Sequence, residues 1–133
     1  MERIKVLIVR PGEKPVLTEI SHTLETLHEI VGGTIQAVYP FDDPVAILCD
    51  DEGKFKGYVP NRALIGEDGE PYDILAGTFI ICGLTAENFG SLSDELAGKY
   101  REKFLWPEMF MRTLGGNIVW FRTKPGEEPR IIG

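Results

Sequence analysis

The chain has 133 residues, of which 43% are hydrophobic and 26% are charged. These fractions are ordinary for a folded protein, and the length suits one domain that buries a core without disulfides or metals. No segment approaches the roughly 20 apolar residues of a membrane-spanning helix, and the N-terminus lacks the pattern of a signal peptide, so we expect a cytoplasmic protein.

The net charge of −7 is unevenly distributed along the chain. Residues 1–98 carry 7 basic and 17 acidic side chains, whereas residues 99–133 carry 7 basic and 4 acidic ones. Nucleic-acid binding relies on cationic side chains that neutralise phosphates, so the acidic body disfavours that class of partner. Two explanations fit the acidic balance. Either it serves solubility alone, or the protein is an inhibitor that presents an acidic face to a basic groove of another protein.

The first third of the chain predicts a β-hairpin followed by a helix. Residues 3–10 alternate charged and aliphatic side chains, and residues 15–20 return after a Pro-Gly turn. Ser21 is a suitable N-cap for the helix, and Gly32 suits the left-handed position that ends one. The apolar stripe between these two residues indicates a helix that packs on a sheet.

The middle of the chain predicts further antiparallel strands. Residues 34–40 and 45–50 have connections too short for a parallel crossover. Residues 60–64 (PNRAL) are expected to set a rigid turn, followed by a polar loop. The longest apolar run, Ile74–Leu84, is interrupted only by two glycines and a threonine, and it predicts one central strand that is buried on both faces.

The last third predicts a second helix and a final strand. Ser93 can cap the helix, and two acidic residues after it favour the positive end of the helix dipole. Residues 108–112 are expected to form a turn and residues 117–123 a strand. We therefore predict an α+β fold in which residues 1–123 form a single domain, with a mixed or antiparallel sheet of about six strands and two covering helices. Residues 124–133 are expected to be a C-terminal tail.

Four segments together carry a resemblance: LETLHEIVGGTIQAV, PNRAL, YDILAGTFIICGL and SLSDELAGKYREKF. The chain resembles a family catalogued as a domain of unknown function, number 3846, from its first strand to its second predicted helix. The resemblance implies a setting in Gram-positive bacteria, their phages and their conjugative elements, often near accessory or anti-restriction-like genes. It implies no catalytic residues, and the piece from Trp106 onward matches least.

Asn61 and Arg62 are the first candidates for a ligand site. The arginine fork suits a phosphate or a carboxylate, and the asparagine can read a base edge or a peptide. Together with Asp73 they would line a nucleotide-type pocket, to which Gly77 would add bare backbone and Thr78 a hydroxyl. The alternative is structural: Asn61 forms a turn, Arg62 pairs with Asp73 or another acid, and Gly77 marks a bulge or a tight crossing.

No motif points to catalysis, a cofactor or a metal. His22 and His28 are six residues apart and face different sides of the predicted helix. The acidic clusters fall at turns and lack the spacing of a calcium loop. Cys49 and Cys82 lie in apolar runs, where we expect buried thiols and no disulfide. We therefore expect neither an enzyme nor a bound cofactor.

Aromatic and basic residues near the C-terminus predict a surface for a partner or a homodimer. Trp120 and Phe121 are neighbours on a predicted strand and point to opposite faces, so one of them lies outside the core unless both faces are covered. The predicted partner surface comprises Trp106, Phe110, Arg112, Trp120 and Arg122.

The sequence thus supports two functional hypotheses. The first is a non-enzymatic binding protein of a phage or mobile element that modulates or inhibits a host defence system by binding a protein. The second is a protein that binds or sequesters a nucleotide-type small ligand through Asn61 and Arg62. An enzyme would be a third, but no positive signal supports it.

Overall fold

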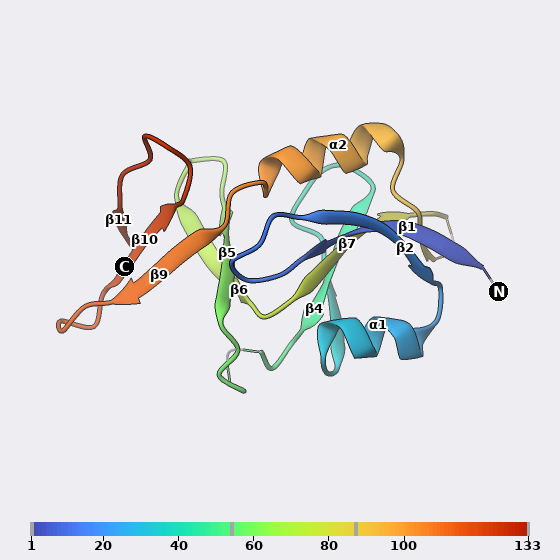
Figure 1. Cartoon of the computed structure of the whole chain (residues 1–133), viewed down its shortest axis with the longest axis horizontal. Helices are drawn as coiled ribbons and strands as arrows, with labels where there is room; N and C mark the ends of the chain where they lie inside the picture. Colours follow the sequence, from blue (N-terminus) through green and yellow to red (C-terminus); the bar gives the residue numbers. More distant parts are fainter. Residues whose placement is uncertain (1, 54, 87, 133) are drawn as a thin grey trace.

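The structure, a computed structural model, describes residues 2–53, 55–86 and 88–132. Strands account for 43% of them and two helices for 14%, and the strands form three sheets (Figure 1). The expectation of an α+β domain with one sheet of about six strands is therefore wrong, because the fold is β-rich. Two segments that were predicted to be turns, residues 60–64 and 108–112, form strands of the two smaller sheets.

The largest sheet has six strands, all in antiparallel pairs. Five follow the order β2–β1–β7–β4–β3, and β8 (Phe89–Gly90) pairs with the end of β7. The hairpin of β1 and β2 and the antiparallel pair of β3 and β4 confirm the sequence prediction. The bounds are Arg3–Val9 for β1, Val16–Ser21 for β2, Ile35–Val38 for β3, Val45–Asp50 for β4 and Phe79–Leu84 for β7.

The apolar run Ile74–Leu84 forms two strands rather than the single strand predicted. Its first part ends β6 (Pro71–Ala76), and its second part is the central strand β7. Gly77 lies between them with a φ of 80°, which disfavours residues with a Cβ. A Cβ at this position would also lie 2.6 Å from the ring of Tyr58. The chain therefore turns a corner at Gly77 and passes from one sheet to another.

Alternate side chains of β1, β4 and β7 contribute to two cores on opposite faces of the large sheet. Helix α1 (Leu24–Val31) covers one face, where Leu27 packs with strand residues such as Ile80. Helix α2 (Asp94–Lys103) covers the other face, where Phe104, just beyond its end, packs edge-on against Phe79 at 5.6 Å. Figure 1 shows the two helices on opposite sides of the sheet. None of the described helices is long and apolar enough to cross a membrane.

Two of the three predicted helix caps lie at their predicted positions, but the N-cap of α1 does not. Thr23, and not Ser21, caps α1 by accepting a hydrogen bond from the backbone N–H of Thr26. Gly32 ends α1 in the left-handed conformation, and Ser93 caps α2, both as predicted.

The two cysteines are buried as predicted, and they belong to different cores. Cys49 lies in the core beneath α2, and Cys82 lies in the core beneath α1. Burial raises the pKa of the Cys82 thiol to about 12, so this group behaves as a small apolar side chain at neutral pH.

Two smaller sheets complete the described structure. β5 (Pro60–Ile65) pairs with β6 in a two-stranded hairpin. β9 (Glu108–Arg112), β10 (Ile118–Arg122) and β11 (Arg130–Ile132) form a sheet in the order β11–β10–β9, which we call the C-terminal sheet. The segment that was expected to be a tail thus supplies a strand. In Figure 1 this sheet lies at the end of the molecule away from the N-terminus.

Substituting Gly83 tests the packing of β7. A Cβ on Gly83 would lie 2.2 Å from the backbone oxygen of Ser91, so Gly83→Ala should lower the free energy of unfolding by about 1–3 kcal/mol. Gly98→Ala on α2 is the matched control, because nothing lies within 4 Å of its added Cβ, and it should stabilise by up to about 1 kcal/mol. Urea unfolding measures both, and equal effects would contradict this packing.

Candidate functional site

Asn61 is fully buried on β5, where it ties three segments together. Its Nδ2 donates to the carbonyl oxygens of Val9, at 2.9 Å, and of Gly77, at 2.8 Å. Its Oδ1 accepts a hydrogen bond of 2.7 Å from Nη1 of Arg62. The amide therefore joins β5 to the end of β1 and to the corner that precedes β7.

Arg62 is also fully buried, and its guanidinium donates to the protein's own backbone. Nε and Nη2 donate to the carbonyl oxygen of Phe104 at 3.2 and 3.0 Å, where α2 ends. Nη2 also donates to the carbonyl oxygen of Glu13 at 2.7 Å. Burial lowers the pKa of Arg62, and the charge of Glu108, with Oε2 at 3.9 Å from Nε, acts in the opposite direction. The geometry supports the structural alternative for Arg62, which pairs with an acid, Glu108. Asn61 is structural too, but it lies in a strand and not in the predicted turn.

Glu108 is the acid that accompanies Arg62, and it attaches the C-terminal sheet to the hairpin. Its Oε1 accepts from the backbone N–H of Ala63 at 2.8 Å and from Nε1 of Trp120 at 2.6 Å. Burial raises the pKa of this carboxyl group, while the two hydrogen bonds and the guanidinium act to lower it. The sequence did not identify this junction, because Glu108 was placed in a turn.

The other three predicted ligand residues line hollows that Arg62 does not line. Asp73 is exposed on β6, and its Oδ1 accepts from the backbone N–H of Ile74 at 2.8 Å. Gly77 and Thr78 line a shallow hollow that none of the other three predicted residues lines. Gly77 meets Asn61 through its backbone carbonyl, but the structure does not assemble the five predicted residues around one cavity.

The predicted partner surface lies mostly on the inner face of the C-terminal sheet. Strand alternation places Phe110, Arg112, Trp120 and Arg122 on the same face as the buried Glu108. Trp120 is fully buried there. Trp106 precedes β9, and Nζ of Lys14 lies 5.3 Å from the centre of its ring.

The outer face of the same sheet is apolar at each position that strand alternation assigns to it. We call this set the outer apolar face: Met109, Met111, Val119, Phe121 and Ile131. Val119 is paired with Met111 on one side and with Ile131 on the other, and Phe121 is paired with Met109. The exposed fractions are 47% for Met109, 51% for Met111 and 69% for Ile131.

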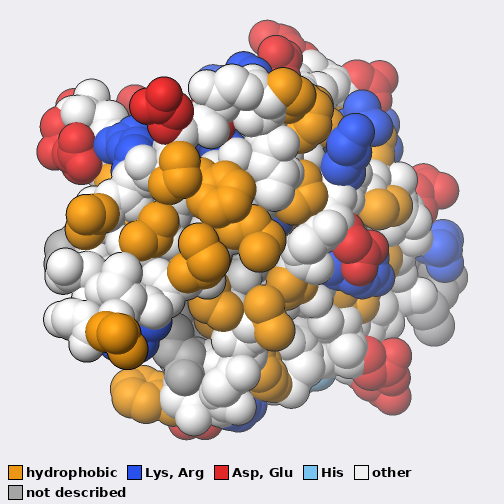
Figure 2. Space-filling view, turned by 60° about the vertical axis from the view of Figure 1, so that its left-hand side comes forward, with side chains coloured by type: hydrophobic (Ala, Val, Ile, Leu, Met, Phe, Trp, Pro, Cys, Tyr) orange, Lys and Arg blue, Asp and Glu red, His pale blue; other side chains and the backbone are white. Residues whose placement is uncertain are grey.

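Figure 2 brings the side of the C-terminal sheet forward and shows hydrophobic side chains gathered near the middle of the view. The sequence analysis expected one of Trp120 and Phe121 to face outward, and the structure places Phe121 on the outer face. The alternation of Met109 with Met111, and of Val119 with Phe121, was the available signal for this surface.

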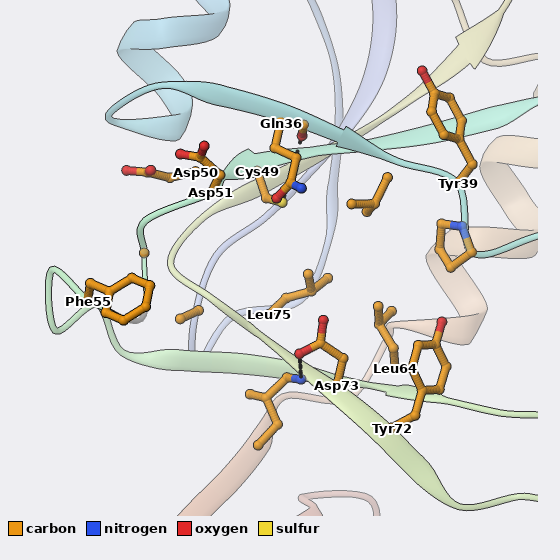
Figure 3. Close-up of a pocket in the computed structure, with 15 residues that line it drawn as sticks. Gln36, Tyr39, Cys49, Asp50, Asp51, Phe55, Leu64, Tyr72, Asp73 and Leu75 are labelled. Carbon is orange, nitrogen blue, oxygen red and sulfur yellow. Dashed lines mark hydrogen bonds between the residues drawn. The ribbon is translucent and has the colours of Figure 1, made fainter.

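A cleft of about 530 Å³ opens between the β3–β4 pair and the β5–β6 hairpin (Figure 3). Its lining includes apolar side chains from both walls: Val38, Cys49, Leu64 and Leu75. It also includes three aromatic side chains and three carboxylates: Tyr39, Phe55, Tyr72, Asp50, Asp51 and Asp73. We call this feature the aromatic-acidic cleft.

Asp50, one of the carboxylates in the cleft, pairs with a lysine. Nζ of Lys56 donates to Oδ2 of Asp50 at 2.8 Å, and this hydrogen bond holds the pKa of Asp50 below its ordinary value. Among the described residues, no group of three or more His, Cys, Asp or Glu side chains could hold a metal ion.

Residues 4–105 match the model of a protein family described as a domain of unknown function (DUF3846). The chain belongs to this family. The match confirms the resemblance found in the sequence, and it ends before β9, so the C-terminal sheet lies outside the matched residues. No match was found among curated proteins or among solved structures.

Truncating Glu108 should detach the C-terminal sheet. Glu108→Ala leaves the guanidinium of Arg62 and two hydrogen-bond donors without their acceptor, so the free energy of unfolding should fall by about 3–5 kcal/mol. Glu108→Gln keeps an oxygen for both donors and should cost clearly less. Urea unfolding followed by tryptophan fluorescence measures both variants, and equal losses would contradict the role of the two hydrogen bonds.

The pH dependence of stability provides a separate test of Glu108. Its pKa in the folded protein lies above the ordinary value of 4.5, so folding favours the protonated form. The stability linked to this shift is present below about pH 4 and is lost as pH rises through the raised pKa. The free energy of unfolding of the parent, minus that of Glu108→Gln, should therefore decrease as pH rises. If this difference in the free energy of unfolding grew with pH instead, burial would not be the main influence on the pKa of Glu108.

Proposed function

We propose that this protein is a non-enzymatic binding protein that recognises another polypeptide through the outer apolar face. The observation that carries the proposal is a sheet face of five apolar side chains drawn from three strands, three of them about half exposed or more. Contiguous apolar surface of this kind marks interaction sites in soluble proteins. Its burial against a partner stabilises a complex by about 25 cal/mol per Å² before the costs of association.

A different protein suits this face better than a second copy of the chain. The net charge of −7 makes two copies repel each other at long range, whereas a neutral or basic partner meets no such repulsion. The outer apolar face carries no charged side chain, so it requires no ion pairs from its partner. Shape and apolar area would therefore provide most of the affinity.

The setting implied by the family resemblance supplies the biological part of the proposal. We place the protein in a phage or mobile element and propose that it modulates or inhibits a host defence system by occupying the surface of one of its proteins. The acidic balance of residues 1–98 supports a basic partner. The alternative of a nucleotide-type ligand finds no support at Asn61 and Arg62, because both side chains are buried and hydrogen-bonded to the protein.

Polar substitutions on the outer apolar face should weaken partner binding without unfolding the chain. Met111→Gln combined with Ile131→Thr removes the two most exposed apolar side chains of this face and introduces no charge. The affinity for the partner should therefore fall by about tenfold or more. The measurement is capture of host polypeptides by the immobilised protein, identification by mass spectrometry, and calorimetric titration of the identified partner.

Val16→Thr combined with Leu17→Gln is the matched control, because these two β2 side chains are also apolar and exposed, at 44% and 42%. It should leave the affinity unchanged. Equal affinity of the Met111→Gln/Ile131→Thr variant and the parent would contradict the proposal. So would sedimentation that shows self-association through this face with no captured partner.

A further inference from the structure

We propose a second binding site in this protein: the edge strand β3 takes an extended segment of a partner polypeptide as an added antiparallel strand, and alternate side chains of that segment enter the aromatic-acidic cleft. The site goes beyond the proposed function, because it lies on the large sheet and uses none of the residues of the outer apolar face. The inference rests on the backbone of β3, on the side chains of β3 and on the space beside it.

β3 forms one edge of the large sheet. Among the described residues, it ends the strand order and pairs only with β4. The backbone N–H of Asp51 donates to the carbonyl oxygen of Thr34, and the same antiparallel register pairs Ile35 with Asp50. Hydrogen-bonded pairs alternate along such a ladder, so the backbone N–H and C=O groups of Ile35 and Ala37 point away from β4. These groups can form hydrogen bonds to one further strand.

The side chains of β3 permit the approach of another strand. Proteins commonly block an exposed edge with a charged side chain or a proline inside the strand. Residues Ile35–Val38 read IQAV and contain neither. The opposite edge strand, β2, carries Glu19, and the guanidinium of Arg3 donates to the backbone oxygen of that residue. The two edges of the sheet therefore differ, and β3 is the one suited to strand addition.

The aromatic-acidic cleft lies on one face of this edge. Gln36 and Val38 line the cleft, whereas Ile35 and Ala37 pack against the core beneath α1. A strand added beside β3 continues the same two faces, so every second side chain of that strand points into the cleft. β3 has only four residues, and the added strand therefore needs these side-chain contacts as well as its backbone hydrogen bonds.

The hairpin wall of the cleft offers apolar contacts to those side chains. Figure 3 shows Gln36 and Tyr39 on the β3 side of the cleft, and Leu64, Tyr72 and Leu75 on the hairpin side. The space between the walls, about 530 Å³, lies within the range of about 300–1,000 Å³ that is typical of ligand sites. In strand addition, backbone hydrogen bonds provide affinity and pockets for alternate side chains provide specificity. The segment that fits is therefore apolar at alternate positions.

Calorimetric titration of the parent protein with capped heptapeptides tests the site. The probe is Ser-Val-Thr-Leu-Thr-Val-Ser, whose two valines and leucine should enter the cleft. A comparison peptide with serine in place of these three residues should bind at least about tenfold more weakly, because it buries less apolar surface.

Backbone methylation of the probe tests strand addition itself. Residues directly opposite each other in an antiparallel pair have side chains on the same face, so the residues that bond to Ile35 and Ala37 have side chains on the α1 face. In the probe these residues are the threonines, and N-methylation of both should abolish binding. N-methylation of both valines is the matched control, because their N–H groups face solvent, and it should change the affinity by less than about threefold.

A proline at the edge tests the site from the side of the protein. Ala37→Pro removes one outward N–H and should abolish binding of the probe. Leu17→Pro on β2 is the matched control, because the N–H of Leu17 also faces outward in its ladder, and it should bind the probe as the parent does. Thermal unfolding checks both folds. Amide exchange measured by NMR on the parent should slow at Ile35 and Ala37 when the probe binds, and not at Leu17.

Equal affinity of the two N-methylated peptides would overturn the proposal, and so would a greater loss for the peptide that is methylated at its valines. Unchanged exchange at Ile35 and Ala37, or no binding of the probe up to millimolar concentration, would overturn it as well. Sedimentation that shows β3 paired with a second copy, with no binding of the probe, would have the same consequence.

The Met111→Gln/Ile131→Thr variant keeps this site distinct from the outer apolar face, because it should bind the probe as the parent does. Loss of probe binding in this variant would contradict the separation of the two sites. Failure to capture a partner through the outer apolar face, with probe binding intact, would reject the proposed function alone.

Discussion

The arrangement of this molecule depends on one buried arginine. Arg62 is fully buried on β5, where an unsatisfied guanidinium would be very costly. Its donors are satisfied only when the end of α2, at Phe104, and the backbone at Glu13 are in place around it. Glu108 then brings the C-terminal sheet to the same point. These contacts therefore fix the position of the β5–β6 hairpin relative to the large sheet and to the C-terminal sheet.

This junction separates two surfaces that have different chemistry. On one side of the hairpin, β6 and the large sheet diverge into a cleft that is acidic and aromatic. On the other side, the inner face of the C-terminal sheet is used to hold Trp120 and Glu108, which leaves its opposite face apolar and exposed.

Within the large sheet, the sequence predicted two antiparallel pairs because local signals decide them. Alternating side-chain types and short connections were sufficient to predict the hairpin of β1 and β2 and the pairing of β3 with β4. The corner at Gly77 was missed because the residues on both sides of it are apolar, and an apolar run does not show where one strand ends and another begins.

The candidate site was harder to predict because it depends on contacts between distant residues. Apart from the adjacent Asn61, the groups that surround Arg62 belong to Glu13, Phe104 and Glu108, which lie 42 or more residues away, so its charge alone indicated exposure. The alternation of apolar residues in β9 and β10 indicated the outer apolar face, but Pro107 favoured a turn over residues 108–112, and residues 124–133 were predicted to be a tail. Only the pairing of β11 with β10 completes that surface.

The central claim is that a partner polypeptide covers the outer face of the C-terminal sheet. Amide hydrogen exchange of the protein, alone and in complex with its captured partner, tests this most directly. The account predicts slower exchange in β9, β10 and β11 on binding, with little change in α1. Protection confined to α1 or to the β1–β2 hairpin, with the C-terminal sheet unchanged, would contradict it.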